Sequence, residues 1–434
     1  MKIDMHCHSK FSERPSIWML KKIGCAESYT EPHELYRIAK RRGMDAVTLT
    51  DHNSINGALE IADLPDTFVS VEATAYFPDD RCKVHVVCYD IDEAQFARIN
   101  KARDNVYELV DYLREENILH ALAHPCFSVN ERLTVEHFEK SLLLFDILEI
   151  NGDQDETVNR IVREILSNLT PDDIERICET HNMEPVMNEP WRKGLIGGSD
   201  DHSSLHVAHA YTEVSGVSKI AEFLDGVQRK TARARLDIPT SPIKMAHHLY
   251  GVTYQFYRQS IGIPDYSDHN VLMRFLDRML QIRERKTPRV WKKIYFNWRR
   301  SRRLSNPGER ASIMQLLQYE AQRTVQRDPE LNKVLDQGLS YSPEPSRHWF
   351  RFVNQISNNM LRHLAKHVTG HFQGVNPFDF FHTLGSGGAL YTLLVPYFAA
   401  YANYSKNRHF SREVHGRFNN ERHMPPAPRL GHFT

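Results

Sequence analysis

The chain has 434 residues, 41% of them hydrophobic and 25% charged, which is typical of a soluble globular protein with two or three domains. Basic and acidic side chains balance at 55 each, yet residues 1–230 carry a net charge of −16 and residues 231–434 one of +16. An acidic first half disfavours polyanion binding by that half alone. The charge break predicts a domain boundary, with a linker at 231–242.

The cysteines and the apolar stretches of the sequence indicate where in the cell the protein is located. The six cysteines show no CxxC spacing and the N-terminus has no signal-peptide pattern, so we expect a cytoplasmic protein without disulfides. The longest apolar stretch, Gly388–Tyr404, is shorter than the roughly 20 residues of a spanning helix. Pro396 is expected to interrupt it. The stretch is either a buried helix or an interfacial one, which would lie against the inner face of the membrane.

Residues 1–215 alternate short apolar runs with amphipathic segments. The runs include KIDMHCH, DAVTLTDH, FVSVEATAY, KVHVVCYD, LHALAHP, DILEING and KGLIGGSDDH. Between the first two, Leu35, Ile38 and Ala39 fall at helical spacing and Gly43 follows as a stop signal. Strands and helices in alternation predict parallel strands joined by crossover helices.

Polar residues occur within or at the end of seven successive runs. They are His6, His8, Asp51, His52, Glu72, His85, His124, Glu149, Asp200 and His202. Residues i and i+2 of a strand share a face, so the first two imidazoles can converge on one point. Side chains from so many strands can meet only if the strands form a ring. The pattern therefore predicts an α/β barrel with its site at the C-terminal mouth of the strands.

A long insertion, residues 153–193, precedes the last of these runs. Thr170 is the expected N-cap of a helix that has Pro171 at its first position. The insertion is long enough to lie over the barrel mouth. Its end brings Arg192 and Lys193 to the foot of the last run, where they either bind an anionic substrate or form ordinary surface.

The order of the polar motifs is similar to that of a known family. DMHCHS, LTDH, a strand Glu, a strand His, AHP and GGSDDH resemble the motifs of the PHP family, the polymerase and histidinol phosphatase metal-dependent phosphoesterases. The resemblance covers residues 1–230. It implies a distorted (β/α)7 barrel, two or three divalent ions of zinc, manganese or iron, and hydrolysis of phosphate esters.

The resemblance also implies a role for each residue. The expected ligands of a first metal are His6, His8, Glu72 and Asp200. Glu72 would bridge to a second metal held by His85 and His124, and a third would be held by His52, His202 and Glu13. Members of the family commonly have Ser-Asp-Gly where this chain has Ser12-Glu13-Arg14, so the third site is expected to be altered.

The residues expected to carry catalysis are Glu72, Asp200 and His202, with Arg14, Arg192 and Lys193 binding substrate. Imidazole and carboxylate ligands together suit zinc, manganese and iron. Two nearby ions lower the pKa of a bridging water and stabilise an in-line attack on phosphorus, so no protein nucleophile is required. Asp51 and Asp201 either orient the adjacent histidines or face solvent, and Glu149 either supports the site or serves a loop.

The second half, residues 243–424, reads as a helical and basic region. Its segment 283–303 has ten basic side chains and one acidic, interleaved with aromatic residues. It is either a helix with a buried aromatic stripe or a surface for an anionic membrane or glycolipid. A nucleic-acid partner is disfavoured because no nucleic-acid-binding fold is visible.

The overall arrangement resembles bacterial proteins in which a PHP module is joined to a glycosyltransferase. This resemblance rests on residues 14–18, on the segment ESYTEP and on the last residues of the chain. Residues 425–434 are expected to begin a truncated Rossmann-like domain whose missing part is a glycosyltransferase partner. A frayed polar tail is the alternative.

Two functions are therefore expected from sequence. The first is hydrolysis of a small phosphorylated metabolite, such as a sugar phosphate or a nucleotide, by a metal-activated water. The second is a regulatory or scaffold module of low activity, associated with a glycosyltransferase, which the altered Glu13-Arg14 pair motivates.

Overall fold

The computed structural model describes residues 1–16, 20–21, 24–237, 244–245, 248–249, 251–252, 255, 323, 327 and 389–422, with the side chains of the last range at 400 and 403–419. The expectations for segments 283–303 and 425–434 lie outside these residues.

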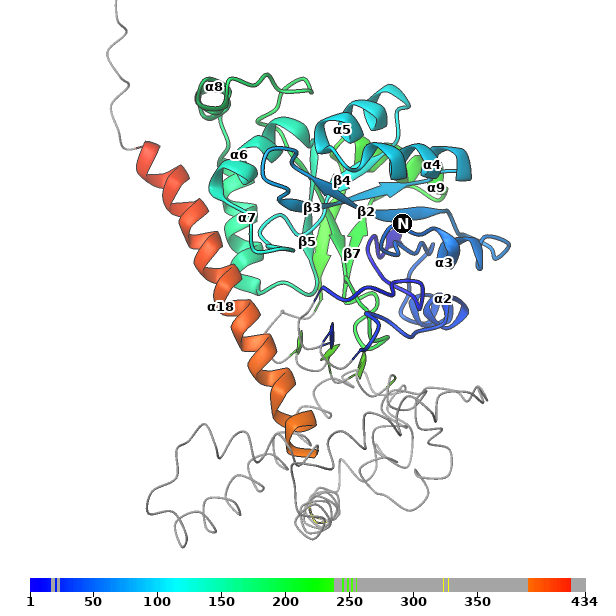
Figure 1. Ribbon diagram of the computed structural model, residues 1–434. Coiled ribbons are helices and arrows are strands. Elements are labelled where there is room, and N and C mark those ends of the chain that lie inside the picture. The colour runs from blue at the N-terminus through cyan, green and yellow to red at the C-terminus, as the bar shows by residue number, and fades with distance from the viewer. Residues whose placement is uncertain are drawn as a thin grey trace, which may run out of the picture.

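A five-stranded mixed sheet forms the centre of the first half (Figure 1). Its strands, in spatial and chain order, are β2 (Ser70–Tyr76), β3 (Lys83–Tyr89), β4 (His120–Leu122), β5 (Ile147–Asn151) and β6 (Gly194–Gly198). The pairs β2–β3 and β3–β4 are antiparallel, whereas β4–β5 and β5–β6 are parallel.

A second sheet has three strands in the order β1, β7, β8. They are β1 (Lys2–Ile3), β7 (Ala210–Glu213) and β8 (Arg233–Leu236), and both pairs are antiparallel. Because β8 pairs with β7, the folded first half continues past residue 230. The expected linker at 231–242 therefore contains a strand of this sheet.

The expectation of parallel strands throughout is wrong for β2, β3 and β4, and the expected barrel is not confirmed. Only six residues connect β2 to β3, and the Phe77 N–H donates to Cys82 O within this turn, so the two strands must run antiparallel. The described strands form two sheets and no closed ladder. Sparse backbone bonds still join β6 to residues 5–8, these to residues 45–52, and these to β2. These bonds bring together the polar residues that occur within or at the end of the apolar runs.

The helices cover the five-stranded sheet and lie beside the N-terminal segments of the chain. They are α2 (Pro32–Arg41), α3 (Asn56–Leu59), α4 (Glu93–Ala102), α5 (Val106–Glu115), α6 (Val135–Leu144), α7 (Glu156–Asn168), α8 (Pro171–His181), α9 (Ile220–Gln228) and α18 (Ala389–Arg422). Two predictions of helix ends are confirmed. Gly43 follows α2 with φ of +83°, and the Thr170 side chain caps α8 by accepting from Asp173 N–H.

The main hydrophobic core lies between the five-stranded sheet and helices α4 to α8. Val71, Val86, Leu148 and Phe138 are among its fully buried members. Each such side chain contributes about 1.5–3 kcal/mol on burial. This core fixes the strand ends on which the polar residues lie.

Helix α18 packs along α6 and α7 (Figure 1). Its Phe418 ring meets Phe138 edge-on at 6.2 Å, and Arg408 Nε–H donates to Asp155 Oδ2 at 2.7 Å. The helix runs unbroken through Pro396, so the expected interruption there is wrong. Packing of its C-terminal part against the first half stabilises the helix despite the lost proline donor. Among the described residues, no helix is both long and apolar enough to span a bilayer.

Candidate metal centre

Six imidazoles converge at one end of the sheets. Neighbouring ring centroids lie between 3.9 and 5.1 Å apart, the shortest separation being that of His8 and His202. The rings belong to His6, His8, His52, His85, His124 and His202. Segments far apart in the chain thus deliver ligand-type nitrogens to one buried point.

Glu72, from the middle of β2, lies at the centre of this cluster and is fully buried. Its two carboxylate oxygens lie 2.6–3.4 Å from ring nitrogens of His6, His8, His52, His85 and His124. One carboxylate facing so many imidazoles is suited to bridging two cations.

Asp200 adds a second carboxylate just after β6. Its Oδ1 lies 3.2 Å from His8 Nε2 and 3.5 Å from His6 Nε2. Both Asp200 and His124 have positive φ, +52° and +29°, which is costly for residues with a Cβ. The fold holds both residues in this strained conformation at the point where their side chains enter the cluster.

Several inward-facing atoms of the cluster are buried without a hydrogen-bond partner. They are His6 Nε2, His8 Nε2 and His202 Nε2. Leaving a buried polar atom unpaired costs about 1–3 kcal/mol, so three together are expensive unless a ligand satisfies them. Three overlapping triads have ligand atoms within 4.8 Å of one another: His8/His52/His202, His6/His8/Glu72 and His52/Glu72/His85. These residues fit a divalent metal ion.

The outward nitrogens of three rings are held by protein groups. His6 Nδ1–H donates to Glu149 Oε1 at 2.9 Å and His202 Nδ1–H to the Asp200 carbonyl at 3.0 Å. The Ser12 hydroxyl donates to Asp51, so it accepts from His8 Nδ1–H at 3.0 Å. Each Nε2 lone pair then faces inward, as in metal-ligating histidines.

These contacts resolve two alternatives left open by the sequence. Glu149 supports the cluster, because its other oxygen accepts from His124 N–H at 2.9 Å. Asp51 also supports it, through the hydroxyls of Ser9 and Ser12. Asp201 instead accepts from Ser203 Oγ and His206 N–H and thus braces the following loop.

Burial and charge set the protonation of the cluster. Burial opposes ionisation of Glu72, yet His85, His52 and His6 hold its pKa well below the usual range. Burial lowers the pKa of His85 and His202 to about 4, so both are neutral and able to bind metal at neutral pH.

Two of the predicted residues lie outside the cluster. Glu13 and Arg14 are exposed and do not line the cavity beside it. Glu27 lies where the third-site carboxylate was expected: it is buried, and its Oε2 is 3.2 Å from His52 Nε2. Burial raises the pKa of Glu27, but His52 outweighs this and brings it to about 2. Sequence reasoning missed Glu27 because a tertiary bond, Glu27 N–H to Ser12 O, folds its loop back.

Arg192 and Lys193 lie just before β6, at the opposite end of that strand from Asp200. Lys193 Nζ donates to the carbonyls of Leu142 and Phe145, and Arg192 pairs with Glu189 at the surface. Neither side chain lines the cavity beside the cluster. The insertion carries them to the wrong end of the strand to bind a substrate there.

A cavity of about 40 Å³ opens beside the cluster. His52, His85, His124, Asp200 and His202 line one part of it. Met245, His248 and Asn403, all from the second half of the chain, line another. His248 is buried, with its ring centroid 5.2 Å from that of His202. No sequence pattern linked these three residues to the site.

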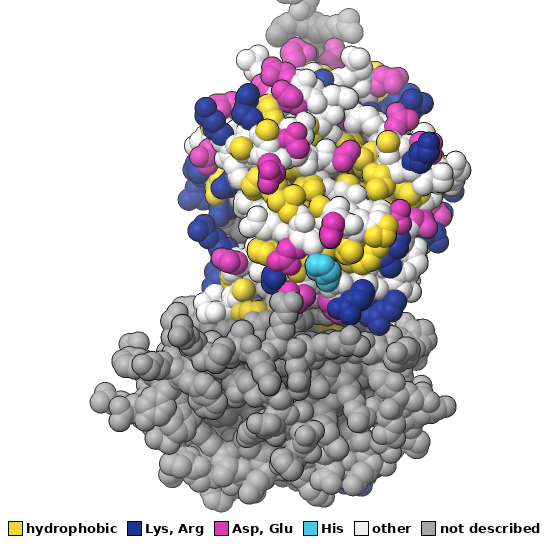
Figure 2. Space-filling view, turned by 90° about the vertical axis from the view of Figure 1, so that its right-hand side faces the viewer, with side chains coloured by type: hydrophobic (Ala, Val, Ile, Leu, Met, Phe, Trp, Pro, Cys, Tyr) yellow, Lys and Arg dark blue, Asp and Glu magenta, His cyan; other side chains and the backbone are white. Residues whose placement is uncertain are grey.

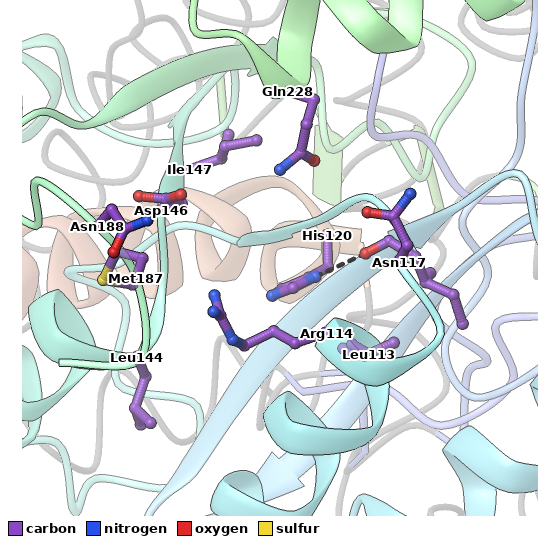
Figure 3. A pocket seen from close by; sticks show the side chains of 11 residues that line it. Leu113, Arg114, Asn117, His120, Leu144, Asp146, Ile147, Met187, Asn188 and Gln228 are labelled. Atoms are coloured by element: carbon purple, nitrogen blue, oxygen red, sulfur yellow. Dashed lines mark hydrogen bonds between the residues drawn. The ribbon is translucent and has the colours of Figure 1, made fainter. Parts of the chain in front are cut away.

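A larger hollow of about 300 Å³ lies at the other end of β4 and β5 (Figure 3). His120 and Asp146 face it, together with Arg114 and the amide side chains of Asn188 and Gln228. His120 Nδ1–H donates to Ile118 O at 2.8 Å, and Asp146 pairs with Lys230 at 2.8 Å. Among the described residues, no triad of metal-ligand atoms occurs in this hollow.

Comparisons with known proteins give limited overlap. No protein-family model matches the chain. An uncharacterized protein of Methanocaldococcus jannaschii, MJ1587, is 38% identical over 68 residues. This match covers 16% of the chain and spans 38% of the length of that relative.

Two solved structures align at low similarity. One is a two-domain protein from Bacteroides vulgatus that contains a predicted PHP-like metal-dependent phosphoesterase, with 12% identity, 60% of this chain and 70% of the other covered, and a TM-score of 0.31. The other is an amidohydrolase from Chromobacterium violaceum with bound sulfate and no metal, with 15% identity, 54% and 98% covered, and a TM-score of 0.31.

Proposed function

We propose that this protein is a metal-dependent phosphoesterase of the PHP type, which hydrolyses a phosphate ester of a small metabolite. The observation that carries the proposal is Glu72, a buried carboxylate placed among the ring nitrogens of five histidines. Beside it, the Nε2 atoms of His6, His8 and His202 are buried without a hydrogen-bond partner. Such a cluster is costly unless cations fill it.

Particular residues would hold each ion. His6, His8 and Asp200 would hold one ion, with Glu72 as the bridge to a second ion held by His85 and His124. His52 and His202 would hold a third, with Glu27 in place of the expected Glu13. When bound, divalent ions activate water and stabilise charge on a phosphoryl group.

The protein's own groups prepare this site. Glu149 and Ser12 orient two imidazoles by holding their outward N–H groups. Asn151 ties Glu149 to Asp200, donating to both carboxylates at 2.9 and 3.0 Å. Because these side chains are fixed by their partners, the ligand atoms need little rearrangement when a cation or substrate enters.

The surroundings favour a small substrate over a polymer. On the described part of the face shown in Figure 2, acidic and basic side chains are interspersed. Residues 1–230 are acidic overall, which opposes a nucleic acid strand. Glu27 offers the carboxylate that Glu13 does not, so the main motive for a low-activity scaffold module weakens. The glycosyltransferase partner and the membrane contact stay predictions from sequence.

A substrate panel tests the proposal. The full chain, loaded with manganese or zinc, would be assayed on an aryl phosphate, sugar phosphates and nucleotides, with metal content measured in parallel. We expect turnover that disappears on chelation and returns on adding metal. Metal-loaded, folded protein that hydrolyses no phosphate ester in the panel would overturn the proposed function.

A further inference from the structure

The cavity beside the metal cluster has a wall that the first half of the chain does not supply. Met245, His248 and Asn403 belong to segments far beyond the strands that carry the ligands, yet they line this cavity with His202 and Asp200. His248 is 3% exposed, and its Nδ1 is buried without a hydrogen-bond partner, 3.8 Å from Asp153 Oδ1. A buried, unpartnered imidazole beside a metal cluster is suited to a ligand that enters the cavity.

The segment that carries His248 is anchored to the loops around the cluster. Lys244 Nζ donates to Gly152 O at 2.9 Å, and Gln255 Nε2 donates to Ser203 O at 2.9 Å. Gly152 follows β5, and Ser203 follows the ligand His202. The imidazole is therefore held in place by contacts on both sides of it in the chain.

Helix α18 braces the same loop from outside. Tyr404 O–H donates to Asp153 O at 3.0 Å, and Asn407 Nδ2 donates to Gln154 Oε1 at 3.2 Å. Asp153 and Gln154 both line the cavity. The second half thus shapes the side of the cavity that faces the metal ligands.

We propose that His248 is a substrate-binding residue of this site, which donates a hydrogen bond to the terminal phosphoryl group of a phosphate monoester. The inference rests on the proposed phosphoesterase function. A cavity of about 40 Å³ holds only about three water-sized groups, so it admits a compact terminal group and not a whole metabolite. A histidine ring carries at least one N–H in either protonation state, so His248 can donate a hydrogen bond.

The test compares two variants of the full chain. His248→Leu removes both ring nitrogens at similar volume, and His248→Asn keeps a donor near the position of Nδ1. His120→Asn is the control, since its half-buried ring faces the distant hollow. Circular dichroism and thermal melting would verify the fold, and metal content would be measured for each protein.

The decisive readout is calorimetric binding of inorganic phosphate to the manganese-loaded proteins. We expect His248→Leu to keep its metal and to weaken phosphate binding roughly ten- to hundred-fold, as for a lost hydrogen bond to a charged group. His248→Asn should recover part of the loss, and the control should match wild type. Wild-type affinity in His248→Leu, loss of metal in that variant, or no phosphate binding by wild type would each overturn the inference.

Turnover separates this inference from the proposed function. A wild-type protein that binds phosphate through His248 but hydrolyses no ester would refute the phosphoesterase and leave the phosphate-binding role standing. For an active enzyme, we expect kcat/KM for an aryl monoester to fall with His248→Leu and bis-aryl diesters to be poor substrates. Equal turnover of diesters would refute the choice of a monoester.

Discussion

Polar side chains gather at both ends of strands β5 and β6, but their hydrogen bonding differs. At the C-terminal end, ring nitrogens of His6, His8 and His202 lack hydrogen-bond partners. At the N-terminal end, Lys193 Nζ donates to two carbonyls at 2.6 and 2.8 Å, and Asp146 pairs with Lys230. Polar groups that have hydrogen-bond partners within the protein need no ligand, whereas buried polar groups without partners indicate a site for a bound ion or molecule.

By volume alone, the hollow at the N-terminal end would be the better candidate for a ligand site. The hollow at the N-terminal end measures about 300 Å³, against about 40 Å³ beside the cluster. The larger volume falls within the usual range of ligand pockets. Even so, the convergence of imidazoles and carboxylates indicates that the smaller cavity is the candidate active site.

The largest effect is expected from Glu72→Gln. The amide cannot bridge two cations, so the variant should lose bound metal and at least about a thousand-fold in kcat/KM, equivalent to several kcal/mol of transition-state stabilisation. Metal analysis and aryl phosphate turnover would measure it, with Glu93→Gln on the exposed start of α4 as control. Retained metal and near-normal turnover would refute the central position of Glu72.

Glu149→Gln should have the next largest effect. The amide can still accept from His6 Nδ1–H but loses the charge that favours this tautomer, so metal affinity should fall about 10- to 100-fold. Competition with a chromogenic chelator would measure the affinity. A variant with unchanged affinity would mean that Glu149 serves only the loop.

Gly198→Ala tests how closely the cluster is packed. A Cβ at residue 198 would lie 2.3 Å from His6 Cβ and 2.8 Å from His6 N, so the histidine strand must shift. We expect a loss of about 1–3 kcal/mol in stability and weaker metal binding. Thermal melting of apo and metal-loaded protein would detect both, and an unchanged difference between the two melting temperatures would contradict the displacement of His6.

Lys193→Met should have the smallest effect on turnover, less than about twofold, because Lys193 is remote from the cluster. Stability should fall by about 1–3 kcal/mol, since two carbonyls lose their donor. A large change in KM would restore the substrate-binding role expected from sequence.

The pH dependence of stability gives a second test of the role of Lys193. Burial lowers the pKa of Lys193 from 10.5 to about 7. Between these values the unfolded chain binds a proton that the folded protein does not, so this residue makes stability rise with pH. In urea melts from pH 7 to 10, the stability of wild type relative to Lys193→Met should increase with pH.

The metal-ligand set was largely readable from sequence. Each of the nine predicted ligands except Glu13 falls within or at the end of an apolar run, a pattern that is visible in the sequence, and the structure brings these eight residues together. Glu13 is the exception. Glu27, which lies in the cluster instead, belongs to a loop whose path depends on tertiary contacts with Ser12.

The fold was less accessible. Alternating runs suggested parallel strands throughout, but the short turn at Phe77–Cys82 permits only an antiparallel pair. β8 could not be recognised because its residues are half exposed and its pairing with β7 is non-local. His248 was missed for the same reason: nothing near it in sequence records that it lies beside His202.

We expect the histidine and carboxylate cluster to bind divalent metal. The test is the number of zinc, manganese or iron ions retained per folded chain after loading and desalting, measured by mass spectrometry. We expect two or three ions in wild type and their loss in Glu72→Gln with the fold preserved. A folded wild-type protein that retains none of these metals would show that the cluster is not a metal site.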